Sequence, residues 1–417
     1  MTTTKNNEHK KLNVPNSTDR GNVIRNVPHL RFPEFEGEWE KCPLGKISTK
    51  ITKKNKGNTI QNVLCNSATL GLIPQNDYFD REIANSNNTE GYYVIEYGDF
   101  VYNPRKSVSA PYGPVNIYTG SIKGIISPLY LCFSVHSIMP SFLYYRFKSS
   151  VWFPYVYSYG DTGTRFDRVS IKDDVFFEMP IYMPSSKEQI KIANLMALLD
   201  ERIATQNKII DKLQSLIKGI NQMVFMNSGN NYKLGEVCEI RSGYSGNQLL
   251  SKKGLKVSRI ETISGHKVNL ERVGYVAPFE SSENYKLQVG DILFSNINSV
   301  EYIGNTAFID KDYDLYHGMN LLRLTPNNMV VIPFYLYLLL NTNRMLNRFK
   351  TVCNKAVSQA SINQTELGKT VVQIPDINAQ KQICELYQAL YDKLESEKYA
   401  NSLFQKQKQY LLRQMFI

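Results

Sequence analysis

The feature that most constrains this 417-residue chain is an internal repeat, in which matching residues recur 190 to 192 positions apart. A period of this length corresponds to a whole domain with an attached helix, and it far exceeds the 20–50 residues of a solenoid repeat. Two similar units can present two similar surfaces to a long, roughly two-fold partner. The repeated pairs are Leu44-Gly45 and Leu234-Gly235, Gly98-Asp99 and Gly290-Asp291, Ser170-Ile171 and Ser361-Ile362, Pro184 and Pro375, Gln189 and Gln380, Ile192 and Ile383, and Gln222-Met223 and Gln414-Met415.

The first part of each unit, roughly residues 31–183 and 231–374, is rich in Tyr, Phe, Ile and Val. These residues stand in short runs between Gly, Asn and Pro clusters, as in Asp291–Phe294. Such runs predict short strands joined by loops. Prolines at 140 and 333 favour helix starts, and we expect helices at Ser141–Phe147 and Phe334–Phe349. Each unit is therefore predicted to contain a mixed α/β module of about 150 residues.

The second part of each unit is predicted to be one helix of about 40 residues. When heptads are counted from Ile192, almost all a, d and e positions are apolar. These positions form an apolar stripe along the helix that is wider than the a/d seam of a two-stranded coiled coil. Pro375-Asp376 marks the start of the second helix, because Asp can cap free amides there. Antiparallel pairing of the two helices would hide both stripes; packing of each helix on its own module remains the alternative. The a/d/e residues of the first helix are Ile192, Leu195, Met196, Leu199, Ile203, Ile209, Ile210, Leu213, Leu216, Ile217, Ile220, Met223 and Val224, with Arg202 and Gln206 as polar exceptions.

Composition narrows the class of protein. The hydrophobic content of 42% supports packed cores, and the six scattered cysteines form no Cys-x-x-Cys pair that would indicate zinc or redox chemistry. The polar stretch at residues 1–27 is expected to be a disordered tail without a signal peptide, and the longest apolar run is too short for a bilayer. We therefore expect a cytoplasmic protein. The net charge of +11 favours a polyanionic partner, although no single segment carries the excess.

No catalytic motif is present in the sequence. Phosphate-cradling glycine loops, the Gly-x-Ser-x-Gly elbow and paired histidines at metal-ligand spacing are all missing, so we expect no catalytic residue, no metal and no cofactor in this chain. Asn103-Pro104-Arg105-Lys106 differs from the Asn/Asp-Pro-Pro-aromatic motif of amino-methyltransferases. What remains is a set of polar and cationic loop residues at corresponding places in both modules, suited to phosphate and base-edge contacts. The predicted DNA-binding residues are Lys53, Lys54, Lys56, Arg105, Lys106, Arg165, Arg168, Lys252, Lys253, Arg259, Asn296, Asn298, Lys355 and Gln359.

Two motifs carry a family resemblance. The stretch from Pro28 to Trp39, followed by Leu44-Gly45, resembles the opening of specificity subunits of type I restriction–modification enzymes. Pro184, Glu188-Gln189, Ile192, Leu195, Leu199-Asp200 and Ile203 resemble the family's helix-entry motif. The second copy departs from it, with Ala379 in place of Glu and Tyr391-Asp392 shifted. The resemblance covers about residues 28–417.

The resemblance implies an α+β fold with a pseudo-twofold repeat. Two target-recognition domains, at residues 28–183 and 229–374, would each read half of an asymmetric bipartite DNA site. Helices at 184–228 and 375–417 would form an antiparallel coiled-coil spacer, and inserting one heptad into both should lengthen the unread gap. The resemblance further implies two modification subunits that bind S-adenosylmethionine, and optional restriction subunits that use ATP and magnesium. The predicted helix-pairing and partner residues are Ile192, Leu195, Met196, Leu199, Ile203, Ile210, Leu213, Ile217, Ile383, Leu386, Leu390 and Leu394.

Two other classes of function remain open. One is a standalone methyltransferase or nuclease with unrecognised motifs, which methyl transfer by the purified chain without partners would favour. The other is a coiled-coil interaction protein that binds no nucleic acid, which salt-dependent binding of duplex DNA would argue against.

Overall fold

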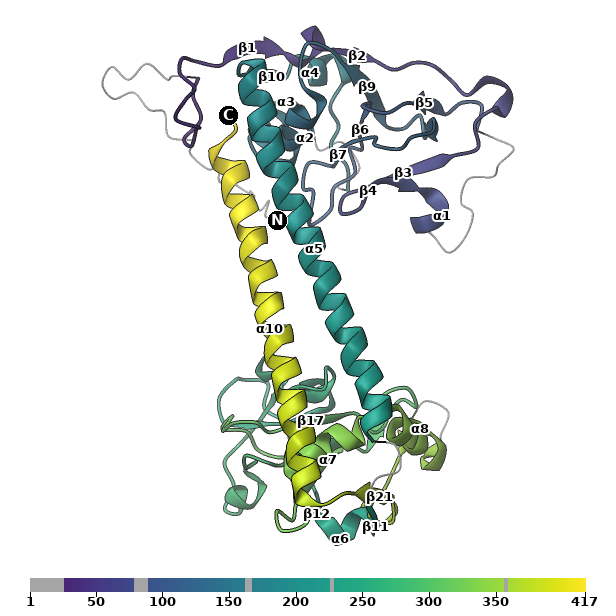
Figure 1. Cartoon of the computed structure of the whole chain (residues 1–417), viewed down its shortest axis with the longest axis vertical. Helices are drawn as coiled ribbons and strands as arrows, with labels where there is room; N and C mark the ends of the chain where they lie inside the picture. The colour runs from purple at the N-terminus through teal and green to yellow at the C-terminus, as the bar shows by residue number, and fades with distance from the viewer. Residues whose placement is uncertain (1–25, 79–88, 162–166, 226–228, 356–358) are drawn as a thin grey trace, which may run out of the picture. The chain divides into compact units, whose positions relative to one another are not determined.

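The computed structural model describes residues 26–78, 89–161, 167–225, 229–355 and 359–417 (Figure 1). The predicted tail at residues 1–27 lies almost wholly outside this range, as does Arg165. The chain divides into two compact units. The first comprises residues up to 204 together with 402–417, and the second comprises residues 205–401.

Each unit contains a four-stranded antiparallel sheet with the same strand order. In the first unit the order is β2-β9-β6-β7, and in the second it is β12-β18-β15-β17. The matching strands fall at repeat-related positions, which confirms that the internal repeat encodes the same four-stranded sheet in both modules. We call this shared sheet the frame of the module. The strands are β2 (Ser48–Lys50), β9 (Leu131–Val135), β6 (Phe100–Tyr102) and β7 (Val115–Ile117), and then β12 (Cys238–Ser242), β18 (Leu321–Pro326), β15 (Ile292–Ser295) and β17 (Thr306–Phe308).

The repeated Gly-Asp pair forms the turn that leads into the central strand of each frame. Gly98 and Gly290 have positive φ angles of 91° and 99°, a backbone region that glycine enters without steric cost. The Asp99 carboxylate accepts the backbone N–H of Glu96 at 2.7 Å, and Asp291 accepts that of Gln288 at 2.8 Å. The motif is therefore a structural turn in both modules.

Helices and a short two-stranded ribbon complete each frame. In the first unit they are α2 (Pro140–Lys148), α3 (Phe153–Tyr159), α4 (Asp173–Phe177), and β1 (Glu40–Pro43) paired with β10 (Pro180–Met183). In the second unit they are α6 (Leu234–Val237), α7 (Pro333–Leu340), α8 (Asn343–Val352), α9 (Gln364–Gly368), and β11 (Asn230–Lys233) paired with β21 (Val371–Ile374).

The expected single helix over Phe334–Phe349 is wrong, because the chain breaks between α7 and α8. Thr342 stands at the break with extended backbone, and its side chain accepts the N–H of Met345 at 3.3 Å. A threonine oxygen that satisfies a free amide starts a new helix at this point. The helix expected at Ser141–Phe147 is confirmed as α2.

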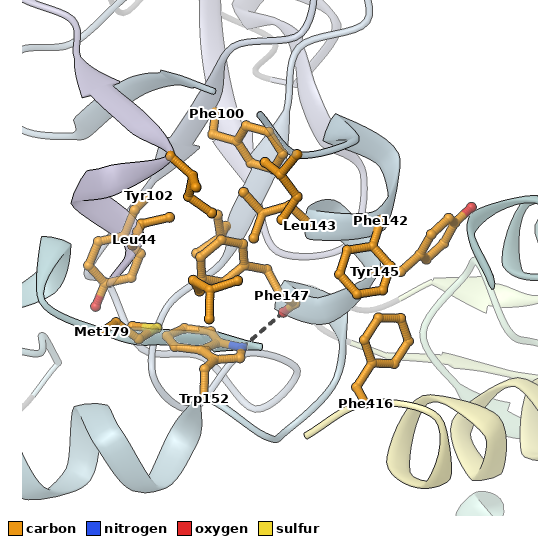
Figure 2. Packing of buried hydrophobic residues seen from close by; sticks show 14 of the residues in the cluster. Leu44, Phe100, Tyr102, Phe142, Leu143, Tyr145, Phe147, Trp152, Met179 and Phe416 are labelled. Carbon is orange, nitrogen blue, oxygen red and sulfur yellow. Dashed lines mark hydrogen bonds between the residues drawn. The ribbon is translucent and has the colours of Figure 1, made fainter. Parts of the chain in front are cut away.

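Aromatic side chains fill the core of the first module (Figure 2). Phe147 packs edge-on against Trp152, with ring centroids 5.6 Å apart, and the Trp152 indole N–H donates to the carbonyl of Phe147 at 3.0 Å. Phe416, which follows the last helix of the chain, lies 5.4 Å from Phe142 between centroids. This contact buries the C-terminal residues in the core of the first unit.

The two modules differ beyond the frame. The first carries a further four-stranded sheet in the order β4-β3-β8-β5, whereas the second carries a two-stranded and a three-stranded sheet, β13-β14 and β16-β20-β19. These extra strands are β3 (Val63–Ser67), β4 (Gly71–Pro74), β5 (Tyr93–Ile95) and β8 (Gly124–Ile126), with α1 (Gln75–Tyr78) beside them, and then β13 (Leu255–Val257), β14 (Gly274–Val276), β16 (Ile297–Asn298), β19 (Asn354–Lys355) and β20 (Ala360–Ser361).

The two long predicted helices are confirmed as α5 (Ser186–Val224) and α10 (Ile377–Gln414), shown in teal and yellow in Figure 1. The Asp376 carboxylate accepts the N–H groups of Asn378 and Ala379 at 2.9 and 3.0 Å, as expected of a helix cap. Within each unit, a segment of α5 lies against a segment of α10.

The two helices pair antiparallel in each unit. In the first unit Asp200 forms an ion pair with Lys408, and the Arg202 guanidinium lies over the Phe404 ring. In the second unit the Asn401 amide donates to Asn207 at 2.8 Å, and the Tyr387 hydroxyl donates to Asn221 at 3.1 Å. Residue numbers on one helix rise as their partners' numbers fall, so the helices run in opposite directions.

The buried face of α5 covers only part of the apolar a, d and e positions that the sequence showed. Ile209, Leu216 and Met223 at the d positions are 37%, 50% and 68% exposed, whereas the a and e positions turn inward. Gln206, an apparent interruption at a, is buried and donates to the carbonyl of Glu397 at 3.2 Å. The exposed apolar surface of α5 therefore includes the d positions Ile209, Leu216 and Met223.

All six cysteines lie in described residues and are free thiols. Among the described helices, none is long and apolar enough to cross a membrane.

Candidate nucleic-acid interface

Three of the predicted cationic residues in the first module come together where strand β6 ends. Arg105 pairs with Arg168 in an isolated antiparallel bridge, and the Lys106 N–H donates to the carbonyl of Asp167 at 2.8 Å. Asn103 orders the start of this loop, because its side-chain oxygen accepts the N–H of Arg105 at 3.0 Å. The segment after β6 thus lies against the segment before α4.

The charges in this cluster are only partly compensated. Arg105 and Asp167 are both exposed, with 3.8 Å between Nε and Oδ2, and such a pair contributes little in water. Residues 26–78, 89–161, 167–225, 229–355 and 359–417 supply no hydrogen-bond partner for the Nε of half-buried Arg168. Arg105 and Lys106 line a hollow of about 530 Å³ whose lining includes Gln75 and Tyr92 but no carboxylate. The arrangement can accept an anionic or polar group.

A buried polar network supports the floor of this hollow. Asn66 donates to the carbonyl of Val101 at 2.9 Å and accepts from Asn116 at 2.5 Å. The Lys148 ammonium donates to the Asn116 side-chain oxygen at 2.5 Å, and burial lowers the pKa of Lys148 to about 8. Satisfied networks of this kind fix side-chain positions and so pre-organise the residues above them.

The second basic cluster of the first module is Lys53, Lys54 and Lys56. These residues and Lys123 line a hollow of about 720 Å³, again without a carboxylate in its lining. Lys53 and Lys56 are exposed, whereas Lys54 is half-buried and makes contacts within the module. Its ammonium donates to the carbonyl of Gly91 at 2.8 Å and lies 3.5 Å from the centroid of the Tyr93 ring. The geometry therefore leaves Lys53 and Lys56 more available to a ligand than Lys54.

In the second module, four predicted residues gather on the sheet β16-β20-β19. Asn298 and Lys355 both stand opposite Ala360, on either side of the central strand, and Gln359 immediately precedes it. Lys355 and Gln359 are exposed. Asn298 already donates to the Ser295 hydroxyl at 3.0 Å. The side-chain oxygen of Asn296 is buried, and no described residue forms a hydrogen bond with it. The patch is polar with a single cation, unlike the arginine cluster of the first module.

Lys252, Lys253 and Arg259 flank strand β13 of the separate sheet β13-β14. Both lysines are exposed, and Arg259 forms an exposed ion pair with Glu261 at 3.5 Å. Among the described residues, no hydrogen bond or ion pair joins these three to the Asn298 patch, and their membership of one interface stays a prediction.

Two arginines of the second module were not predicted from the sequence. Arg241 on β12 and Arg323 on β18 stand directly opposite one another across the sheet. The available signal was a lone cation inside the apolar run Leu321-Leu-Arg-Leu324, which a buried strand would not ordinarily contain.

The predicted helix-pairing residues divide by burial. Ile192, Met196 and Leu199 are buried with the C-terminal residues in the core of the first unit, and Leu394 is buried in the second. Leu386 is 42% exposed, because Tyr387 takes the inward position beside it. The half-buried members are Leu195, Ile203, Ile210, Leu213, Ile217, Ile383 and Leu390.

Acid–base and metal chemistry has few candidates. Within the described ranges, no group of three or more His, Cys, Asp or Glu residues could hold a metal ion. Burial raises the pKa of Asp99 to about 6, but its carboxylate accepts a turn amide and lines none of the hollows described above. The arrangement is that of a binding surface with ordered polar and cationic side chains.

Comparison with known proteins agrees with this architecture. Residues 228–402 match the family model described as the type I restriction modification DNA specificity domain. The putative type I restriction enzyme MjaX specificity subunit of Methanocaldococcus jannaschii is 43% identical over 150 residues, which is 35% of each chain. The HindI specificity subunit of Haemophilus influenzae is 28% identical over 133 residues, 31% of this chain and 28% of the relative. The matches thus span about a third of these curated relatives.

Solved structures share the fold over nearly the whole chain. The S subunit from M. genitalium covers 94% of this chain and 99% of its own, with a TM-score of 0.54 and 15% identity. A chain from a structure of complex assembly and conformational transition of the type I R-M system covers 92% and 98%, with a TM-score of 0.59 and 16% identity.

The fold is that of a duplicated α/β protein in which each module carries its own surface loops and a segment of two antiparallel helices. The chain is similar in sequence, over part of its length, to specificity subunits of type I restriction enzymes, and it shares its fold with the solved structures named above.

Proposed function

We propose that this chain recognises DNA for a type I restriction–modification complex, with each module reading one half of an asymmetric bipartite site. The observation that carries the proposal is the contrast between frame and loops. Both modules keep the same four-stranded sheet order, yet one adds the sheet β4-β3-β8-β5 and the other adds β13-β14 and β16-β20-β19. Equal frames with unlike loops suit two unlike half-sites, because base edges are read by loop side chains.

The chain acts without catalysis of its own and assembles with modification subunits, and optionally with restriction subunits. S-adenosylmethionine, ATP and magnesium belong to those partners. The absence of enzyme motifs from the sequence and the apolar d positions left exposed on α5 support this division of labour. The six free thiols and the DNA substrate support a cytoplasmic location.

The test is adenine methylation mapped across a host genome with and without this chain, in the presence of its modification subunits. We expect methylation at one bipartite sequence, present only with the chain. Replacing residues 31–183 with the module of another family member should change one half of that sequence and leave the other intact. A change in both halves, or none, would contradict the proposal.

The alternative of a standalone methyltransferase is tested with the purified chain, duplex DNA and S-adenosylmethionine. We expect no methyl transfer until modification subunits are added. Robust transfer by the chain alone would support the enzyme instead.

A further inference from the structure

Arg323 is a buried cation without a carboxylate partner. Arg323 is the third residue of strand β18, and it is 7% exposed. One terminal nitrogen donates to the carbonyl of Lys286 at 3.2 Å, and Nε finds no hydrogen-bond partner in the part of the chain that the structure describes. Among the described residues, no carboxylate comes within ion-pair distance of it. A buried charge without a counter-charge is unfavourable, because burial removes the water that would solvate it.

Arg241 increases this cost, because it stands directly opposite Arg323 on the neighbouring strand. Side chains in that relation are neighbours on one face of the sheet, and like charges there destabilise it. Glu239 contacts Arg241 at 2.6 Å, but both partners are about half exposed. That ion pair lies in water and contributes little against the buried charge of Arg323.

The common frame of the two modules does not require a cation at this place. In the first module Cys132 occupies the matching position of β9, opposite Val101, just as Arg323 lies opposite Leu293. Cys132 is buried in a hydrophobic cluster. The charge is therefore particular to the second module.

Both arginines line a hollow of about 340 Å³ that contains further hydrogen-bond donors and no carboxylate. His317 on its wall is 1% exposed, and burial, helped by the charge of Arg323, lowers the His317 pKa to about 4. His317 is neutral at pH 7, so the two arginines supply the charge. The complete lining is Arg241, Ser242, Ser281, Asn284, Tyr285, His317, Arg323 and Gln364.

We propose that this hollow binds a phosphate group held by Arg323 and Arg241. Two guanidinium groups match the geometry and the charge of a phosphate dianion or phosphodiester, and both can donate paired hydrogen bonds to it. The phosphate would neutralise Arg323, for which the described residues supply no carboxylate, and would compete with Glu239 for Arg241. Serine, asparagine and tyrosine groups on the lining can donate to the remaining oxygens.

The same chemistry could come from free inorganic phosphate or from the backbone of bound DNA. The second source rests on the proposed function; the first does not.

The experiment measures thermal unfolding of the full chain against inorganic phosphate, with chloride at equal ionic strength as reference. A ligand that binds only the folded state raises the unfolding temperature, by about 2–4 °C for each kcal/mol in a domain of this size. We expect a phosphate-specific rise in the wild type that Arg241→Gln and Arg323→Met both abolish. The matched control, Arg272→Gln at an exposed arginine of the same unit, should keep it.

Two results would overturn the proposal: a wild type that responds equally to phosphate and chloride, or variants that retain the phosphate response. Arg241 is exposed, so Arg241→Gln gives a result even if Arg323→Met fails to fold. Glu239→Gln should strengthen the phosphate response, because it removes the competing carboxylate.

A duplex DNA arm separates the two sources. If the site takes a backbone phosphate, Arg241→Gln should weaken duplex binding about tenfold and reduce the salt slope by about 1. If it takes free phosphate, duplex binding is unchanged while the phosphate response is lost. A wild-type chain that responds to phosphate but binds no DNA, even with modification subunits, would refute the proposed function and leave this site standing.

Discussion

The side-chain oxygen of Gln380 accepts the backbone N–H of Ile332 at 2.8 Å, while its amide donates to the carbonyl of Pro375 at 2.9 Å. The repeat-related Gln189 makes the same two bonds, with Met139 and Pro184, each at 2.9 Å. Ile332 and Met139 directly precede α7 and α2, so each glutamine joins the start of a long helix to the start of the module's own helix. The duplicated glutamine is thus a buried clamp between helix and module.

The Gln380 amide also donates to the carbonyl of Val330 at 3.1 Å. Replacing Gln380 with Ala should destabilise the second unit by roughly 2–4 kcal/mol, since the N–H of Ile332 and the carbonyls of Pro375 and Val330 lose their partners together. The measurement is the denaturant midpoint of the full chain, followed by circular dichroism. The exposed neighbour Gln382 provides the control, and Gln382→Ala should stay within about 0.5 kcal/mol of the wild type. Equal effects of the two substitutions would remove the clamp role.

The pH dependence of the first unit should include a contribution from Asp99. Burial raises the pKa of this carboxyl from 3.8 to about 6, so the folded state binds the proton more tightly than the unfolded chain. The contribution of Asp99 to the free energy of unfolding therefore falls as the pH rises from about 4 to 6, and it is level above that range. Asp99→Asn keeps an oxygen for the N–H of Glu96 and removes the charge.

The asparagine variant should consequently exceed the wild type by ~1 kcal/mol above pH 7, a value reduced for partial exposure of the side chain. The advantage should shrink as the pH drops toward 4. Unfolding temperatures of both proteins across pH 4.5–7.5 test this. A difference that is constant with pH would show that Asp99 is not the titrating group.

Glu188 and Arg31 form a two-bonded ion pair at 2.7 and 2.8 Å, in which Glu188 is fully buried. Removing the acid alone, as in Glu188→Leu, should cost about 3–5 kcal/mol, because Arg31 then loses its buried partner. The double variant Arg31→Met with Glu188→Leu should recover most of that loss. Denaturant midpoints of the two single variants and the double variant form the test, and additive losses would contradict a coupled pair.

The sequence predicted the repeated frame because its marker residues obey local rules. Gly98 and Gly290 mark a left-handed turn, and Asp376 marks a helix cap, wherever they occur. The failure at Thr342 has another cause: Asn341-Thr342-Asn343 is a polar break with a capping residue, and the helix expected over Phe334–Phe349 was carried through it. Ala379 stands at the position of the second repeat that corresponds to Glu188. Glu188 is paired with Arg31, which belongs to a segment that precedes only the first module, so the second repeat has no matching arginine that would require an acid.

The candidate site was less predictable because it depends on contacts between distant segments. Arg105 and Arg168 meet only through pairing of two loops, and Asn298 meets Lys355 only across β20. The burial of Arg323 likewise depends on the sheet that places it opposite Arg241. Periodicity could not distinguish Ile209 as an exposed residue, because three apolar columns on α5 offered more than one possible seam.

The loop clusters of the two modules should affect different halves of the methylated sequence. Arg105 belongs to the cluster with Lys106 and Arg168, whereas Lys355 belongs to the sheet β16-β20-β19. In complexes with modification subunits, Arg105→Gln and Lys355→Gln should each weaken binding by about 1–3 kcal/mol if the residue contacts a base, and each should relax the sequence at one half-site. Mapping of methylated adenines gives the readout for both halves at once.

The control for this comparison is Lys212→Gln, at an exposed lysine on α5 that lies outside both loop clusters. It should leave the methylated sequence unchanged. A variant that weakens methylation without relaxing either half-site would assign its residue to a phosphate, because a phosphate contact positions the protein and carries no sequence information. If Arg105→Gln and Lys355→Gln relaxed the same half-site, the two modules could not be reading separate halves, since the two residues belong to different units of the chain.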